Sequence, residues 1–342
     1  MERGGIEVIE GSETCCGRTG LAKLEKMTSD PAEAIADADV IMITVRAQWH
    51  GDVLDALLPC LKDGQIILFN TGYWGSLRVA AKCREAGLFE KVTLAESNIM
   101  PYLSKKGEDI ASDRAGVYII RYKRNLKVAA FPGKRTRSVY TVVKQLYAQS
   151  EEAPNVLATN LAAGGNPSLH IPFAIPIAGY MFDRYQGCHF YGEATIQGAR
   201  LVDAFDRERI SVARALGCKE VETAPEAMEK AYGYTGKSFA EALRKSEHAN
   251  SYILAGTDFA SEDVCFSLIP LVKLGESLGI PTPVTRAMVE VFGVMMGRSY
   301  WESGIALSEL GFSGLTAKQI ERYVMEGSVG GHDTQYSVGS ND

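Results

Sequence analysis

The chain has 342 residues, of which 46% are hydrophobic and 23% charged, and its formal net charge is −6. That length suits two domains, and that composition is ordinary for a soluble globular protein. The negative charge argues against nucleic acid and anionic membrane surfaces as partners.

The seven cysteines have no regular spacing, so we predict neither a disulfide framework nor a metal site. Reduced thiols fit a cytoplasmic protein. The longest apolar runs, such as residues 40–45, are far shorter than the roughly 20 residues of a membrane span. No apolar segment follows the first residues, so we expect no signal peptide.

The first segment, residues 1–150, alternates predicted strands with predicted helices. The strands are expected at residues 6–9, 40–45, 64–70 and 92–96, and the helices at residues 30–38, 53–61, 77–86 and 136–148. Residues 117–122 and 126–131 are expected to form a hairpin. This alternation predicts an α/β domain with a Rossmann-like, doubly wound parallel sheet and helices on both faces.

Ligands of such sheets bind at the carboxyl ends of the strands. Here those ends carry Val45, Arg46, Gly72 and Glu96, which are our candidates for cofactor binding. The glycine-rich turn that holds a dinucleotide in a Rossmann fold is missing, since the sequence contains no G-x-G-x-x-G. The segment therefore looks like a nucleotide-binding domain that begins after its first β-α-β unit.

The second segment, residues 151–330, has helical periodicity almost throughout, which predicts an all-helical domain. Its helices are expected at residues 194–216, 224–232, 239–245, 261–278 and 284–296, with a kink at Pro270. The charged run at residues 206–209 is most simply a solvated or salt-bridged face. The tail, residues 331–342, is rich in glycine and serine and is predicted to be disordered.

His170 stands in the stretch around which the chain is organised, residues 164–173. Two glycines open it, and Asn166 followed by Pro167 predicts a helix start with Asn166 as its cap. A histidine at the head of a helix in apolar surroundings is a candidate for proton transfer. On local features alone, a core histidine with one satisfied hydrogen bond is the simpler interpretation.

Asp263 is the second candidate, at a predicted helix start where Ser261 would be the cap. Its simplest role is an acidic residue that favours the helix dipole. Paired with His170, it would hold the imidazole in one tautomer and stabilise its protonated form.

Four passages resemble the octopine/nopaline (opine) dehydrogenase family, over nearly the whole chain. They include the elements Asn166-Pro167-x-x-His170 and Glu262-Asp263-Val264, which are moderately specific together and weak alone. The passages are residues 38–50 with 61–65, 164–172, 190–193 with 206–209, and 261–264 with 279–283.

The resemblance implies a Rossmann domain, an all-helical substrate domain and a cleft between them. It further implies reductive condensation of an amino acid's amine with a 2-oxo acid, with NAD or NADP as cofactor. His170 would be the acid/base and Asp263 its orienting carboxylate, since reduction by hydride needs a proton donor beside the acceptor atom. Asn166 and Asp258 would contact the substrates. The expected partners are these small molecules and a second copy in a homodimer.

Three departures from the family pattern matter. Asp258 stands where family members carry an arginine that suits a substrate carboxylate, so a cationic or neutral group is expected there. The loop Val45-Arg46-Ala47 lacks the family's middle proline. The glycine-rich start is missing, so we predict a truncated sequence, or a gap that another chain or a rearranged segment fills, and weak nicotinamide binding.

Two other functions stay open. One is a related hydroxy-acid dehydrogenase, which needs no amine. The other is a shortened, non-catalytic paralogue that binds small molecules or a full-length partner.

Overall fold

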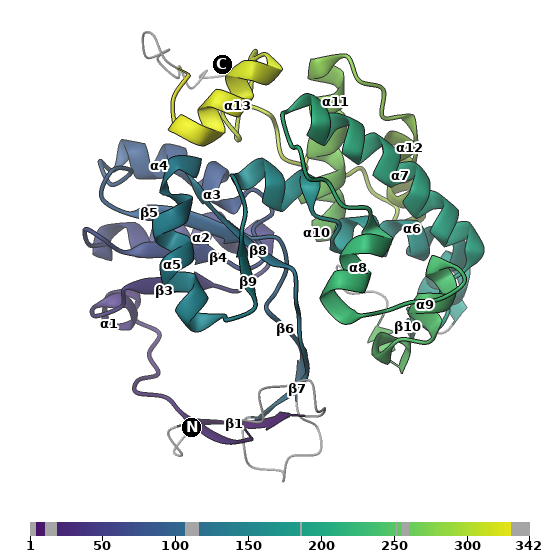
Figure 1. The fold of residues 1–342 in the computed structure, drawn as a ribbon, viewed down its shortest axis with the longest axis horizontal. Helices are drawn as coiled ribbons and strands as arrows, with labels where there is room; N and C mark the ends of the chain where they lie inside the picture. The colour runs from purple at the N-terminus through teal and green to yellow at the C-terminus, as the bar shows by residue number, and fades with distance from the viewer. Residues whose placement is uncertain are drawn as a thin grey trace.

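The computed structural model describes residues 5–10, 19–106, 116–184, 187–250, 252–254 and 260–329. Two parts lie side by side, a sheet part from the first half of the chain and a helical part from the second (Figure 1). A smaller sheet projects from the sheet part, away from the end where the C-terminal helix lies.

The described strands form three sheets. The five-stranded sheet has the order β3 (Val40–Ile43), β4 (Ile66–Phe69), β5 (Thr93–Ser97), β8 (Leu126–Phe131) and β9 (Ser150–Glu152). The projecting sheet has the order β2 (Gly20–Lys23), β1 (Gly5–Glu10), β7 (Gly116–Tyr122) and β6 (Tyr102–Lys106). A two-stranded sheet pairs β10 (Gly187–His189) with β11 (Tyr252–Leu254).

The helices of the sheet part surround the five-stranded sheet, and those of the helical part pack on one another (Figure 1). In the sheet part they are α1 (Pro31–Ile35), α2 (His50–Leu57), α3 (Gly75–Arg78), α4 (Ala80–Glu85) and α5 (Thr136–Leu146). Those that follow are α6 (His170–Ala174), α7 (Ile196–Ala215), α8 (Ala224–Tyr232), α9 (Phe239–Arg244), α10 (Ser261–Asp263), α11 (Ile269–Leu278), α12 (Pro283–Met295) and α13 (Ala317–Glu326).

The five-stranded sheet is covered on both faces, as the alternation of strands and helices predicted. Along β4, Leu68 packs with Val139 and Val143 of α5, whereas Ile67 and Phe69 join the larger core on the opposite face. Strands β3, β4 and β5 are parallel. The prediction of a wholly parallel sheet is wrong, because β8 runs antiparallel to β5.

The predicted hairpin of residues 117–122 and 126–131 is also wrong. Strand β7 pairs with β1 and β6 in the projecting sheet, whereas β8 pairs with β5 and β9. The chain changes direction between them at Asn125, whose φ of 59° is left-handed, and its amide donates a hydrogen bond to Glu222 of the helical part. That distant partner holds the bend, and local sequence does not reveal it.

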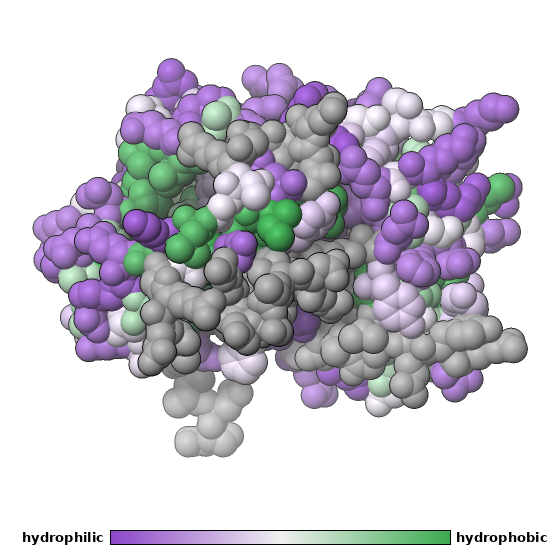
Figure 2. All heavy atoms as spheres, turned by 90° about the horizontal axis from the view of Figure 1, so that it is seen from below, coloured by the Kyte–Doolittle hydropathy of each residue, from purple (hydrophilic) through white to green (hydrophobic). Residues whose placement is uncertain are grey.

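Strand β3 lies at an edge of the five-stranded sheet. Strand β1, predicted at residues 6–9, does form, but it lies in the projecting sheet. Among the described residues, no strand pairs with the outer side of β3, and Met42 on it is 44% exposed. Seen from the side of the projecting sheet, hydrophobic residues reach the surface between polar ones (Figure 2).

Helix α7 is the centre of the helical part. Its apolar stripe of Val202, Phe205, Val212 and Leu216, spaced as helical periodicity requires, is buried, and Gly217 ends the helix with a φ of +81°. The solvated interpretation of residues 206–209 is wrong for three of them, because Asp206, Glu208 and Arg209 are buried. The salt-bridged alternative is right for Arg209 and Asp206, which lie 2.7 Å apart.

The helix expected at residues 261–278 is interrupted. A π-helical turn, Val264–Leu268, separates α10 from α11, and Pro270 lies in the first turn of α11, where its missing N–H is tolerated. Ser261 is not the cap, because Ala260 occupies that position, with a φ of +62°. The helical part is not wholly helical, since β10 and β11 belong to it.

The last described helix, α13, returns to the sheet part (Figure 1). Its Tyr323 ring packs against Phe131, and Arg84 donates a hydrogen bond of 2.8 Å to the carbonyl of Gly327. The contacts of α13 with the sheet part therefore join the two parts in addition to the covalent connection. The predicted disordered tail, residues 331–342, lies outside the described residues.

Glu208 offers a test of this packing. Its carboxylate accepts hydrogen bonds from the first turn of α12, from the N–H of Val284 and from the N–H and hydroxyl of Thr285. We expect Glu208→Ala to lower the free energy of unfolding by about 2 to 3 kcal/mol, because buried donors lose a charged acceptor. Urea denaturation measures this. Arg207→Ala, at an exposed position one residue away, should change it by less than about 0.5 kcal/mol.

Candidate active site

His170 and Asp263 meet at the boundary between the two parts. His170 begins α6 and Asp263 ends α10, and His170 Nδ1 lies 2.8 Å from Asp263 Oδ2. Asp263 is only 2% exposed. The other ring nitrogen, Nε2, lies 3.1 Å from the hydroxyl of Tyr191. The arrangement is that of an acid/base histidine oriented by a carboxylate.

The second oxygen of Asp263 accepts a hydrogen bond from the sheet part. The Tyr73 hydroxyl donates to Asp263 Oδ1 over 2.7 Å. Burial, followed by the negative charges of Asp263 and Glu262, raises the pKa of Tyr73 well above its ordinary value. Tyr73 is therefore protonated at neutral pH and remains a hydrogen-bond donor.

Glu262 brings a second carboxyl group to the site. Burial is the main cause that raises its pKa, although a hydrogen bond from the backbone N–H of Ala47 opposes this. Ala47 follows the end of β3, so Glu262 joins α10 to the strand end that carries Val45 and Arg46. Both of these candidate cofactor contacts are exposed at that strand end.

Two side chains contact the backbone carbonyls of the loop Val45-Arg46-Ala47. Arg78 donates a hydrogen bond of 2.9 Å to the carbonyl of Ala47, and His50 Nε2 lies 3.3 Å from the carbonyl of Val45. Strands β3 and β4 are paired in parallel, so this loop and the turn at Tyr73 lie at the same edge of the sheet. The two candidate regions are therefore close to each other, as the strand order predicted.

Gly72 and Glu96 lie deeper. A Cβ at Gly72 would lie 2.7 Å from the Cβ of Glu96, so these residues pack directly on each other. Glu96 is fully buried, and burial raises its pKa. Its carboxylate accepts hydrogen bonds from Ser76, Thr159 and Asn160. These hydrogen bonds favour a role of Glu96 in joining the two parts over direct contact with a cofactor.

A small pocket opens beside Tyr73, the residue that donates a hydrogen bond to Asp263. It is lined from both parts, among others by Thr71, Asn98, Gly165 and Asn166. The prediction that Asn166 is a helix cap is wrong, since Gly165 precedes the short 3₁₀ turn Asn166–Ser168 and no side chain caps it. The Asn166 side chain instead lies beside the Tyr73 hydroxyl. Asp258, the other candidate for substrate contact, lies outside the described residues.

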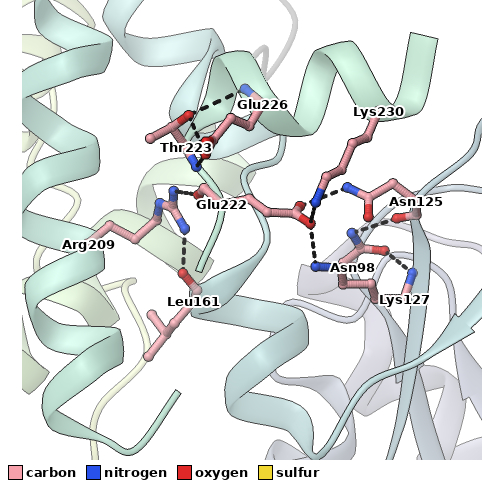
Figure 3. A network of polar contacts seen from close by, with 9 residues as sticks. All are labelled: Asn98, Asn125, Lys127, Leu161, Arg209, Glu222, Thr223, Glu226 and Lys230. Atoms are coloured by element: carbon pink, nitrogen blue, oxygen red, sulfur yellow. Dashed lines mark hydrogen bonds and ion pairs between the residues drawn. The ribbon is translucent and has the colours of Figure 1, made fainter. Parts of the chain in front are cut away.

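A second polar network, centred on Glu222, links the two parts (Figure 3). Glu222, between α7 and α8, accepts hydrogen bonds from Lys127 and Asn125 of the sheet part and from Lys230 of α8. Burial alone would raise the pKa of Glu222, but these hydrogen bonds lower it below its ordinary value. Arg209 donates to the carbonyls of Glu222 and Leu161, which positions this segment.

Sequence reasoning missed two residues of the site, Tyr73 and Tyr191. Tyr73 follows the strand end at Gly72 that we had selected, and Tyr191 lies in one of the family-like passages. Their positions were therefore marked, but nothing in the sequence showed which side chains they would reach.

In the described part of the chain, no cluster of three or more His, Cys, Asp or Glu side chains is arranged to hold a metal ion. No helix among the same residues is long and apolar enough to cross a membrane.

The chain is similar to known opine dehydrogenases. A family model described as NAD/NADP octopine/nopaline dehydrogenase, alpha-helical domain, matches residues 152–296. The opine dehydrogenase of Arthrobacter sp. (strain 1C) is 28% identical over 330 residues, which are 95% of this chain and 88% of that protein.

Solved structures show the same fold. Octopine dehydrogenase with NADH and L-arginine superposes with a TM-score of 0.72 at 15% identity, over 97% of this chain and 89% of the other. NADP⁺-bound yersinopine dehydrogenase gives a TM-score of 0.65 at 12% identity, over 95% and 87% of the two chains. The resemblance to opine dehydrogenases is confirmed. The coverage of these relatives does not support the predicted truncation.

His50, which supports the strand-end loop, makes a pH-dependent contribution to stability. Burial, then the positive charge of Arg78, lowers its pKa to about 4. The unfolded chain therefore binds this proton more tightly than the folded one. The contribution is complete above about pH 6.5 and is lost as the pH falls towards 4, by up to about 3 kcal/mol.

We expect His50→Gln, which cannot titrate, to flatten the fall in the free energy of unfolding between pH 7 and pH 4 by about 2 to 3 kcal/mol. Urea denaturation at several pH values measures this. His189→Gln, at an exposed position, is the matched control and should keep the slope of the wild type. Equal slopes for wild type and His50→Gln would show that His50 is not held neutral by the fold.

Proposed function

We propose that this chain, a homologue of the opine dehydrogenases and an NAD(P)-dependent oxidoreductase acting on CH–NH bonds, reductively condenses an amino acid with a 2-oxo acid. The observation that carries the proposal is the contact of His170 with Asp263, 93 residues apart. Tyr73, which bonds Asp263, lines a small pocket to which both parts contribute.

In the proposed reaction the amine of the amino acid attacks the 2-oxo carbonyl, and loss of water leaves an imine. NAD(P)H, when bound, supplies the hydride that adds to the imine carbon. His170 in its protonated form donates a proton from Nε2 to the nitrogen, so that a secondary amine forms. Asp263 stabilises the imidazolium before the transfer and keeps Nδ1 protonated after it.

For cofactor and substrates we propose contacts at the same edge of the sheet. Val45 and Arg46 are exposed there, and a guanidinium is suited to a phosphate of NAD or NADP. Gly72 and Glu96 shape the floor beneath. The pocket position of Asn166 supports a substrate contact. The sequence contains no G-x-G-x-x-G turn to bind the pyrophosphate, so Arg46 is the main phosphate contact in this proposal.

Two further expectations remain proposals. No disulfide forms among the described cysteines, which supports a cytoplasmic location: Cys60, Cys83, Cys188, Cys218 and Cys265. A homodimer stays a prediction.

The dyad is tested by substitution. His170→Ala should lower kcat by a factor of about 10² to 10⁴, the usual contribution of a general acid, with little change in NAD(P)H affinity. Asp263→Asn should flatten the pH–rate profile because the imidazole loses its orienting anion. Turnover is followed as NAD(P)H oxidation with pairs of amino acids and 2-oxo acids.

His189→Ala, an exposed histidine on β10, is the matched control and should keep full turnover. Oxidation of NAD(P)H by a 2-oxo acid without any amine would favour a hydroxy-acid dehydrogenase instead. A titration in which neither NADH nor NADPH binds would favour a non-catalytic paralogue.

The substrate contact of Asp258 can be tested in the same assay. If it faces the substrates, Asp258→Arg should lower the KM of substrates with a free carboxylate at least several-fold, because a bidentate ion pair becomes available. Asp203→Arg, at an exposed position of α7, controls for the change of charge. Equal KM values for both variants would place Asp258 away from the substrates.

A further inference from the structure

Asp263 is the residue of the dyad that accepts a side-chain hydrogen bond from Tyr73 of the sheet part. Its two oxygens have different donors. His170 Nδ1, in the helical part, lies 2.8 Å from Oδ2. The Tyr73 hydroxyl, in the sheet part, donates a hydrogen bond of 2.7 Å to Oδ1. Asp263 is buried, so each donor offsets part of the cost of keeping a carboxylate away from water.

The backbone holds Tyr73 in place. Tyr73 and Trp74 have left-handed φ values of 44° and 63°. The N–H of Trp74 donates to Asn160 Oδ1 over 2.9 Å, and its ring packs edge-on against Phe312. Both tyrosine and tryptophan side chains are buried. Because its turn is anchored in this way, the Tyr73 hydroxyl has little freedom to leave Asp263.

A hydrogen bond to one oxygen of a carboxylate weakens the attraction that the other oxygen exerts on a proton. Tyr73 therefore competes with His170 for the charge of Asp263. Because Tyr73 remains protonated, its hydrogen bond to the Asp263 carboxylate persists throughout the pH range in which a histidine titrates. The imidazolium of His170 is stabilised less than it would be by Asp263 alone.

We propose that Tyr73 is a positioning residue that fixes the orientation of Asp263 and lowers the proton affinity of His170. Its catalytic consequence rests on the proposed function, in which His170 donates the proton. Since Tyr73 follows β4, the acid strength of His170 depends on the contact between the two parts. Protein that has lost this contact would hold a histidine of the wrong proton affinity.

Other titratable groups also face the dyad. Tyr191, after β10, contacts His170 Nε2, and Glu262 of α10 lies close enough to interact with His170 electrostatically. Arg46, from the loop after β3, acts on Glu262 in turn. Replacement of Tyr73 by phenylalanine leaves all three in place, so a change in His170 titration would report the lost hydroxyl.

The test is Tyr73→Phe, read by NMR titration of labelled histidine side chains, with the His170 signal assigned from His170→Ala. The midpoint of the His170 titration should move to higher pH by about 0.5 to 1 unit, the size expected for one charge-assisted hydrogen bond. The alkaline limb of the pH–rate profile should move the same way, and kcat should fall about tenfold with KM nearly unchanged.

Tyr147→Phe is the matched control, because Tyr147 is equally buried and its hydroxyl contacts only Met42 Sδ, at 3.0 Å, among its described hydrogen-bond partners. It should leave the His170 titration and kcat unchanged. A midpoint that stays, or moves to lower pH, in folded Tyr73→Phe would overturn the proposal.

A second variant covers the case in which Tyr73→Phe does not fold. Site-specific 3-fluorotyrosine at position 73 keeps the ring and the hydroxyl but makes the phenol a stronger acid and donor. The His170 midpoint should then move to lower pH, and an unchanged midpoint would contradict the proposal.

The two proposals can fail separately. The NMR titration needs no substrate, so a shifted midpoint in a protein that condenses no amino acid would support the role of Tyr73 and refute the proposed reaction. Active condensation with an unshifted midpoint would do the reverse.

Discussion

The structure depends on a buried carboxylate that is shared across the boundary between its two parts. Asp263 keeps its charge away from water only because Tyr73 and His170 satisfy its oxygens from opposite sides. A buried acid without such partners would be costly and would be neutralised. The same contact that orients the histidine therefore also requires that the sheet part and the helical part stay together.

Other acids repeat this arrangement along the boundary. Glu96 of β5 collects donors from Thr159 and Asn160 of the helical part. Glu222 accepts a hydrogen bond from Lys127 of β8, and Glu262 accepts one from the N–H of Ala47, which follows β3. The cost of desolvating a buried ion pair can exceed its Coulombic gain, so these contacts are weak evidence for net stability. Here they set the relative position of the strand ends and the dyad.

This construction suits chemistry that needs components from both parts. The exposed strand end with Arg46 lies on one side of the boundary and the helix start with His170 on the other, while Glu262 links them. In the proposed reaction, a hydride donor at the first and a proton donor at the second would approach one substrate together. Fixed acids between them limit the freedom that would otherwise separate the two groups.

The sequence by itself determined most helices and strands and the apolar stripe of α7, because periodicity is local. It marked His170 and Asp263 as candidates but did not show that they meet. Only the tertiary structure decided that β7 and β8 part at Asn125, that Glu208 is buried as the acceptor for α12, and that Asn166 faces Tyr73 instead of capping a helix. These outcomes depend on partners far along the chain: Tyr73 and Asp263 are 190 residues apart. A polar side chain carries no local sign of the group that will satisfy it, so burial and pairing are settled only when distant segments pack together.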